Sequence, residues 1–239
     1  MKVLISGMGN PQNLGKMLEI YGIDVSYVDR TRPFIKGSFD IFLVFGVRPK
    51  NVLYALTGPG KKIWRFQGSD GFKPRPFIKL LMKIVGGNIL YASNGLKREV
   101  GLKGEVLATP INTDLFNPVP GVKRDKEVLY YCPGGNEEIY QMDLCPEGAT
   151  VLDGSIPYEN MPEVYSRHQK YIRWTTHDAN PKMPFEALLC GCEVWVNGEQ
   201  IYEVPDFMLM EKVIPLWIKY LLSIQHSEVN RPLEETTND

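Results

Sequence analysis

The chain has 239 residues, of which 44% are hydrophobic and 23% charged, and its net charge is −1. This length and composition allow one large or two small domains with apolar cores. The longest apolar runs, residues 77–85 and 213–224, are interrupted by lysines or a proline, which excludes a membrane-spanning helix. The apolar stretch at residues 2–6 is too short for a secretory signal, so we expect a cytoplasmic protein.

The two halves of the chain differ in charge. Residues 1–118 carry 17 Lys and Arg against 8 Asp and Glu, a net of +9, and residues 119–239 carry 10 against 20, a net of −10. A basic half joined to an acidic half indicates two domains with different partners. The basic half suits an anionic acceptor, a membrane surface or nucleic acid, and attraction between the two halves is the alternative without a partner.

The four cysteines lack the spacing of a disulfide framework or of a zinc site. We expect reduced thiols in the core at Cys132, Cys145, Cys190 and Cys192. No metal site is predicted.

The first half alternates short apolar strands with helical segments, the spacing of an α/β domain with a parallel sheet. We expect strands over residues 2–6, 23–29, 41–47, 63–66 and 88–93, and helices over residues 13–21, 77–85 and 94–100. A loop with Gly7, Gly9 and Asn10 follows the first strand. It lacks the Gly-x-Gly-x-x-Gly spacing, so a dinucleotide fingerprint is not indicated.

The segment Phe72–Val85 is basic and amphipathic, with Lys79 and Lys83 four residues apart on one helix face. Two interpretations stay open. Such a helix covers a sheet in many α/β domains, and it also suits peripheral contact with a membrane that carries lipid-linked acceptors.

The second half repeats the alternation after the hinge-like run Pro118–Gly121. We expect strands over residues 127–132, 149–152, 171–175 and 192–196, and helices over residues 161–167, 185–190 and 207–224. Pro215 lies inside the last helix, where a kink or break is expected. Residues 228–239 are polar and predicted to fray.

The stretch from Tyr171 to Pro205 is the most informative part of the chain. A strand leads into a turn at His177–Pro181, and a helix with Pro184 in its first turn follows. In a parallel sheet, such a helix points free backbone N–H groups toward the crevice where ligands bind. Asp178 and Glu186 are placed to accept hydrogen bonds from the neutral hydroxyls of a sugar or ribose, so we predict a polyol-phosphate site.

The pattern Asp-x7-Glu-Ala-Leu-x-Cys-Gly-Cys-Glu-Val, which begins at Asp178, resembles the donor-site signature of glycosyltransferase family 4. Three further segments resemble motifs of that family: residues 61–70 (KKIWRFQGSD), 109–118 (TPINTDLFNP) and 156–165 (IPYENMPEVY). Gln67 stands where the family commonly has His, and the first acid of the signature is Asp rather than Glu. The family's Arg/Lys pair for the donor pyrophosphate has no counterpart after residue 132.

The resemblance implies a minimal GT-B fold, an α/β fold in which two Rossmann-like domains face each other across a cleft. Residues 1–118 would form the acceptor-side domain and residues 119–210 the donor domain. Residues 211–239 would form a helix that returns to the first domain, and a frayed tail. The implied activity is retaining, metal-independent transfer of a hexose from a nucleotide-diphosphate sugar, without a cofactor. The acceptor is unknown: a glycan, a lipid-linked molecule or a protein.

The resemblance also implies residue roles. Asp178 would face the donor sugar, Glu186 would bind the nucleotide ribose, and Lys182 would replace the missing pyrophosphate cations. The other predicted donor-binding residues are Gly134, Gly135, Ser155, Ile156, Met183 and Pro184. The predicted acceptor-side residues are Gly7, Gly9, Asn10, Arg65, Gln67 and Asp70.

Two alternatives stay open. The missing Arg/Lys pair motivates a non-catalytic or degenerate module that binds a sugar nucleotide without turnover. We do not expect nucleic acid as a partner, but the basic half motivates a second alternative, a glycosyltransferase that acts on nucleic acid.

Overall fold

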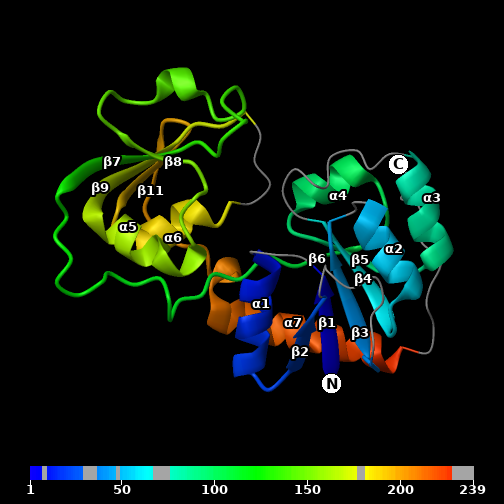
Figure 1. The fold of residues 1–239 in the computed structure, drawn as a ribbon. Coiled ribbons are helices and arrows are strands. Elements are labelled where there is room, and N and C mark those ends of the chain that lie inside the picture. The colour runs from blue at the N-terminus through cyan, green and yellow to red at the C-terminus, as the bar shows by residue number, and fades with distance from the viewer. Residues whose placement is uncertain (7–9, 29–36, 47–48, 67–75, 177–180, 228–239) are drawn as a thin grey trace. The chain divides into compact units, whose positions relative to one another are not determined.

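The structure, a computed structural model, describes residues 1–6, 10–28, 37–46, 49–66, 76–176 and 181–227. The chain divides into two compact units (Figure 1). Unit 1 consists of residues 1–110 together with 211–239, and unit 2 of residues 111–210. Residues 111–118, predicted to end the first domain, lie in unit 2.

Unit 1 is built on a six-stranded parallel sheet with the strand order β2-β1-β3-β4-β5-β6. Its strands are β1 (Lys2–Ser6), β2 (Asp24–Tyr27), β3 (Ile41–Phe45), β4 (Lys61–Phe66), β5 (Asn88–Tyr91) and β6 (Glu105–Val106). The central strand β3 is buried along its whole length, as expected for a parallel sheet covered on both faces. The order reverses between β1 and β3, which is the topology of a doubly wound fold.

Four helices connect these strands: α1 (Asn10–Ile20), α2 (Pro49–Thr57), α3 (Pro76–Val85) and α4 (Asn94–Val100). Helix α4 illustrates how local sequence sets the bounds. The Ser93 side chain accepts a hydrogen bond from the Leu96 N–H at the helix start. Gly101 ends the helix at a φ of 69°, a left-handed conformation that glycine adopts without a steric penalty.

The last helix, α7 (Met210–His226), returns to unit 1, where it contacts Arg65 of β4 and Ala108, which follows β6. The Trp217 indole donates to the Ala108 carbonyl at 3.0 Å, and Trp217 itself is fully buried. The helix continues through Pro215, which is exposed and is its sixth residue, so the predicted break does not occur. Pro215 has no backbone N–H, so one hydrogen bond of the helix is missing at this point while the helix continues on both sides.

Unit 2 contains a five-stranded sheet with the order β11-β10-β9-β7-β8. Its strands are β7 (Lys126–Tyr131), β8 (Thr150–Leu152), β9 (His168–Arg173), β10 (Glu193–Val196) and β11 (Glu199–Ile201). All neighbours are parallel except β10 and β11, which form a hairpin. The two turn residues, Asn197 and Gly198, have φ values of 51° and 81°, so the Asn-Gly pair makes the tight turn that this hairpin requires.

Two helices, α5 (Met161–Arg167) and α6 (Met183–Leu189), complete unit 2 together with the short 3-10 turns η2 (Met142–Leu144), η3 (Tyr158–Asn160) and η4 (Asp206–Met208). All four cysteines are free thiols. Cys132, Cys190 and Cys192 lie in the core as predicted, whereas Cys145 is only half-buried. Burial raises the pKa of the Cys190 thiol to about 12 and that of Cys192 to about 11, so both stay protonated at neutral pH.

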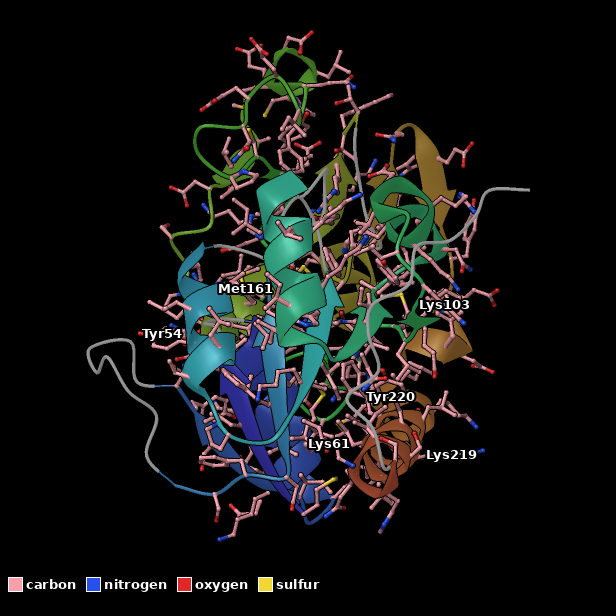
Figure 2. All side chains as sticks on the ribbon, turned by 90° about the vertical axis from the view of Figure 1, so that its right-hand side faces the viewer. Tyr54, Lys61, Lys103, Met161, Lys219 and Tyr220 are labelled. Carbon is pink, nitrogen blue, oxygen red and sulfur yellow. The ribbon has the colours of Figure 1, made fainter. Side chains whose placement is uncertain are left out.

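The predicted fold class is therefore confirmed: two Rossmann-like α/β units, each with a largely parallel sheet. Figure 2 shows the side chains that fill these units. Across the part of the chain that the structure describes, no helix combines the length and the apolar character needed to cross a membrane.

Candidate functional site

The strand order of unit 2 reverses at β7, which lies between β8 and β9. In open parallel sheets, ligands bind at the carboxyl ends of the strands where the order reverses. Gly134 and Gly135 follow β7, and Ser155 and Ile156 follow β8, so these predicted residues lie at one edge of the sheet. The Gly134 N–H donates to the Asp153 carbonyl at 3.3 Å, which joins the two loops.

Neighbouring carboxylates already occupy two of the predicted backbone donors. The Gly135 N–H donates to Glu137 Oε1 at 3.1 Å, and the Ser155 N–H donates to Asp153 Oδ1 at 2.9 Å. Hydrogen bonds from the residues' own loops lower the pKa of both carboxyl groups. A phosphate that used these N–H groups would therefore have to displace an anion that is already bound.

Helix α6 carries the second acid of the predicted signature. Lys182 precedes the helix, Pro184 lies in its first turn, and the Glu186 N–H donates to the Lys182 carbonyl at 2.9 Å. Lys182 and Glu186 are thus one turn apart and share a face of the helix. The Glu186 side chain is 1% exposed and that of Lys182 7%, so both charges lie inside unit 2.

These two side chains form a compact cluster with Tyr158, which we call the Glu186 cluster. The Tyr158 hydroxyl donates to Glu186 Oε1 at 2.7 Å. Lys182 Nζ lies 3.2 Å from the same carboxylate oxygen and 3.2 Å from the Tyr158 hydroxyl. The ammonium also lies over the tyrosine ring, 4.9 Å from its centroid. The charge of Glu186 is therefore balanced within the cluster.

Two further aromatic rings pack beside the Glu186 cluster. The Phe116 ring meets that of Tyr158 edge to face at a centroid distance of 5.2 Å, and it meets the Tyr165 ring at 6.1 Å. Burial, and then the Glu186 charge, raise the pKa of the Tyr158 and Tyr165 hydroxyls far above that of a free tyrosine. Both stay protonated, so Tyr158 is a lasting hydrogen-bond donor to Glu186.

A second cation that the sequence analysis did not single out lies at the carboxyl end of β9. Arg173 is buried, and its guanidinium carbon lies 4.6 Å from the Tyr131 ring centroid and 5.0 Å from that of Tyr140. The two rings are perpendicular and 5.0 Å apart, so the guanidinium occupies the corner between them. Its contact with Tyr131 follows from the pairing of β9 with β7 and is not encoded in any local motif.

The structure gives partial information on the other predicted site residues. Asp178, Gly7, Gly9, Gln67 and Asp70 lie outside the described residues, and so does the side chain of Asn10. The side chains of Met183 and Pro184 are half-buried and buried, respectively. The predicted roles of all these residues stay predictions.

Arg65, a predicted acceptor-side residue, is 1% exposed. Its guanidinium donates to the Tyr91 carbonyl at 2.7 Å and to Thr109 Oγ1 at 3.0 Å, and it lies 5.0 Å from the Trp217 ring centroid. These contacts join β4, β5 and α7, which gives Arg65 a structural role within unit 1. Contact with an acceptor stays a prediction.

Within the described ranges, no group of three or more His, Cys, Asp or Glu side chains is arranged to hold a metal ion. Metal independence stays an expectation.

No family model and no curated protein matches this chain. Several solved structures do. AviGT4, a glycosyltransferase involved in avilamycin A biosynthesis, matches with a TM-score of 0.62 and 11% identity over 94% of this chain and 98% of its own. A sucrose-phosphate synthase from Thermosynechococcus elongatus matches with a TM-score of 0.54 and 11% identity over 82% and 81%.

An alpha-glucosyltransferase in complex with UDP and a 13-mer DNA that contains a central A:G mismatch matches with a TM-score of 0.52 and 11% identity, over 95% of this chain and 90% of its own. At these identities the likeness shows the fold alone. Each of the three matches spans more than four fifths of both chains, so the likeness includes both units. Membership of glycosyltransferase family 4 stays a prediction.

Proposed function

We propose that this chain is a retaining glycosyltransferase that transfers a sugar from a nucleotide-diphosphate donor and that unit 2 binds the donor. The Glu186 cluster is the observation that carries the proposal: a buried carboxylate at the start of a helix, next to the sheet edge where such folds bind ligands. The fold that this chain shares with AviGT4 and the alpha-glucosyltransferase is further support.

In this proposal Glu186 accepts hydrogen bonds from the ribose hydroxyls, and Asp178 accepts them from the donor sugar. A carboxylate suits neutral hydroxyls because it is an acceptor only. The nucleotide sugar is the co-substrate, and we propose no metal ion and no cofactor. The departing diphosphate gains negative charge, which cations or backbone N–H groups must stabilise.

A non-catalytic module that binds the sugar nucleotide is the second candidate, and a specific observation favours it. The Lys182 amine is bound to Glu186 and Tyr158, and the Gly135 N–H is bound to Glu137. Two predicted phosphate contacts are therefore engaged within the protein. Such a site binds the nucleoside of the donor but does not stabilise the negative charge of the leaving diphosphate.

In this proposal unit 1 binds the acceptor. The acceptor is a glycan, a lipid-linked molecule or a protein. Helix α3 has two exposed apolar side chains four residues apart, Leu80 and Ile84, with the exposed Lys83 between them. This supports the proposal of peripheral membrane contact through Phe72–Val85. Sedimentation with vesicles that contain anionic lipid tests it. Leu80→Ser with Ile84→Ser should abolish sedimentation, and unchanged sedimentation contradicts the proposal.

Nucleic acid remains the alternative acceptor, with the basic half of the chain as its support. Binding to duplex DNA at low ionic strength, with affinity that falls steeply as salt is added, would favour this alternative. Absence of binding at low salt would remove it.

The deciding experiment measures nucleoside diphosphate release from a panel of uridine, guanosine, adenosine and thymidine diphosphate sugars, with mass spectrometry of the products. We expect one donor to be turned over, and Glu186→Ala to reduce turnover at least about 100-fold. Glu163→Gln, an exposed carboxylate in unit 2, is the matched control and should retain full activity. Binding of a donor without turnover would support the non-catalytic module, and absence of binding would contradict both.

A further inference from the structure

The Glu186 carboxylate is held through one of its two oxygens. The Tyr158 hydroxyl donates to Oε1 at 2.7 Å, and the Lys182 ammonium forms an ion pair with the same oxygen at 3.2 Å. No hydrogen bond from a described residue reaches Oε2. Oε2 is therefore the oxygen of this carboxylate that no described donor uses, in a side chain that is 1% exposed as a whole.

The Tyr158 side chain cannot turn freely away from Glu186. Its ring packs edge to face on the fully buried Phe116, and the Lys182 ammonium lies on the ring face. Tyr158 follows Pro157 and begins the short turn η3, so the backbone at its base is also constrained. The hydroxyl is therefore directed at Oε1 before any ligand binds.

This geometry fixes which carboxylate oxygen is available to a ligand. A free carboxylate rotates about its last side-chain bond, and a ligand that needs one orientation must restrict that rotation on binding. In unit 2 the restriction is already present in the folded protein. Preorganisation of this kind improves affinity for a ligand that donates to Oε2, and it leaves contacts elsewhere in the site unaffected.

We infer that Tyr158 is a positioning residue for ribose recognition: its hydroxyl holds Oε1 of Glu186, so that Oε2 accepts the hydrogen bonds of the nucleotide ribose. The inference rests on the proposed function and deepens it. Tyr158 itself does not touch the ligand. Its contribution depends on Glu186 and disappears when the carboxylate is removed.

Isothermal titration with nucleoside diphosphates and their 2′,3′-dideoxy counterparts tests this. Uridine, guanosine and adenosine diphosphates are titrated into the wild-type chain, Tyr158→Phe, Glu186→Gln and the double variant. We expect the wild type to bind the ribonucleotide about 30-fold more tightly than the dideoxy form. In Tyr158→Phe this preference should fall to about threefold, because Oε2 of the charged Glu186 carboxylate is then less well oriented for its hydrogen bonds to the ribose. Affinity for the dideoxy form should change less than about twofold.

The double variant of Tyr158→Phe and Glu186→Gln should have the same ribose preference as Glu186→Gln alone. Both residues act through one contact, the hydrogen bonds from the ribose to Glu186. Tyr202→Phe removes a hydroxyl from an exposed tyrosine of unit 2 and is the matched control. Phe116→Leu keeps the Tyr158 hydroxyl but loosens its ring. It should reduce the ribose preference by less than Tyr158→Phe does, which provides a second readout if Tyr158→Phe folds poorly.

Equal loss of affinity for both nucleotide forms in Tyr158→Phe would show that Tyr158 only packs the core and would overturn the inference. Unchanged ribose preference would overturn it as well, with the proposed function intact because the nucleotide still binds. If the wild type binds none of the diphosphates, both the inference and the proposed function are overturned.

Discussion

Arg65 in unit 1 and Lys182 in unit 2 are both buried cations, and their partners differ in charge. None of the described contacts of Arg65 is a carboxylate: a carbonyl, a hydroxyl and an indole ring surround it. Burial accordingly lowers the pKa of its guanidinium. Lys182 instead lies 3.2 Å from the Glu186 carboxylate.

The difference separates a structural contact from a candidate site. Two nitrogens of the Arg65 guanidinium donate to groups that hold segments of unit 1 together, its buried Nε has no described partner, and no anionic group takes part. The Lys182 pair includes a carboxylate with one oxygen that no described donor uses. A buried cation that meets only neutral groups of its own unit has a structural role, whereas a carboxylate with an oxygen that no described donor uses is a candidate for ligand contact.

Alkaline pH should have the largest effect, and it should act on both units. Burial raises the pKa of Tyr91 and Tyr220 in unit 1 and of Tyr158 and Tyr165 in unit 2. A tyrosine whose pKa is raised in the folded state stabilises the fold fully at pH values below its ordinary pKa of 10.0. This stabilisation is lost as the pH rises from 10.0 through the pKa of the folded state. Loss of the circular dichroism signal above about pH 10 should therefore coincide with the last part of the rise in tyrosinate absorbance, which comes from these buried tyrosines. Ionisation of all 12 tyrosines at a constant circular dichroism signal would contradict this expectation.

Substitution of Lys182 should have the largest effect among single variants. Lys182→Met leaves the Glu186 carboxylate buried without a cation, which should lower the free energy of unfolding by about 3 kcal/mol in urea denaturation. The double variant with Glu186→Gln removes the orphaned charge and should regain most of that loss. A loss below about 1 kcal/mol in the single variant would show that the pair behaves like an exposed ion pair.

Arg65→Met should cost less, although Arg65 is more deeply buried than Lys182. Methionine fills the volume of the side-chain stem, and the lost hydrogen bonds are offset by removal of a charge that has no carboxylate partner. The free energy of unfolding should fall by about 1 kcal/mol. Nucleotide affinity, measured by titration, should stay within about twofold of the wild type. A larger change in affinity would contradict the structural role of Arg65.

The smallest expected effect comes from Lys61, which lies at the start of β4 and donates to the Ile224, Gln225 and Ser227 carbonyls at the end of α7. A cation at a helix C-terminus satisfies free carbonyls and complements the helix dipole. Lys61→Met should lower the unfolding free energy by about 0.5 to 1 kcal/mol. Figure 2 labels both Lys61 and the matched control Lys219, an exposed residue of α7. Lys219→Met should have no measurable effect, and equal losses in the two variants would contradict the capping role.

Strong local signals made parts of the fold predictable. The helices over residues 94–100 and 161–167 have their predicted bounds, because Ser93 and Gly101 cap the first and Pro162 begins the second. Helix α2 (Pro49–Thr57) was not predicted. Strand β11 was also missed, although the Asn197-Gly198 pair is a hairpin signal that the sequence does contain.

The candidate site was predictable only in part. Lys182 and Glu186 were identified because they lie four residues apart, on one face of a helix whose start is predicted by Pro184. Tyr158 was missed as a partner because its hydroxyl is directed by packing on Phe116, which lies 42 positions earlier in the chain. Arg173 meets Tyr131 through strand pairing, and no periodicity within either strand indicates that contact. Such contacts follow from tertiary packing.

Hydrogen–deuterium exchange in the presence of the preferred nucleoside diphosphate tests the central claim, that unit 2 binds the donor through the Glu186 cluster. Slower exchange should appear in residues 153–160 and 183–190, because a bound ligand suppresses local opening of the segments that contact it. The same regions should lose this protection in Glu186→Gln. Protection confined to unit 1, or equal protection in the wild type and Glu186→Gln, would contradict the account.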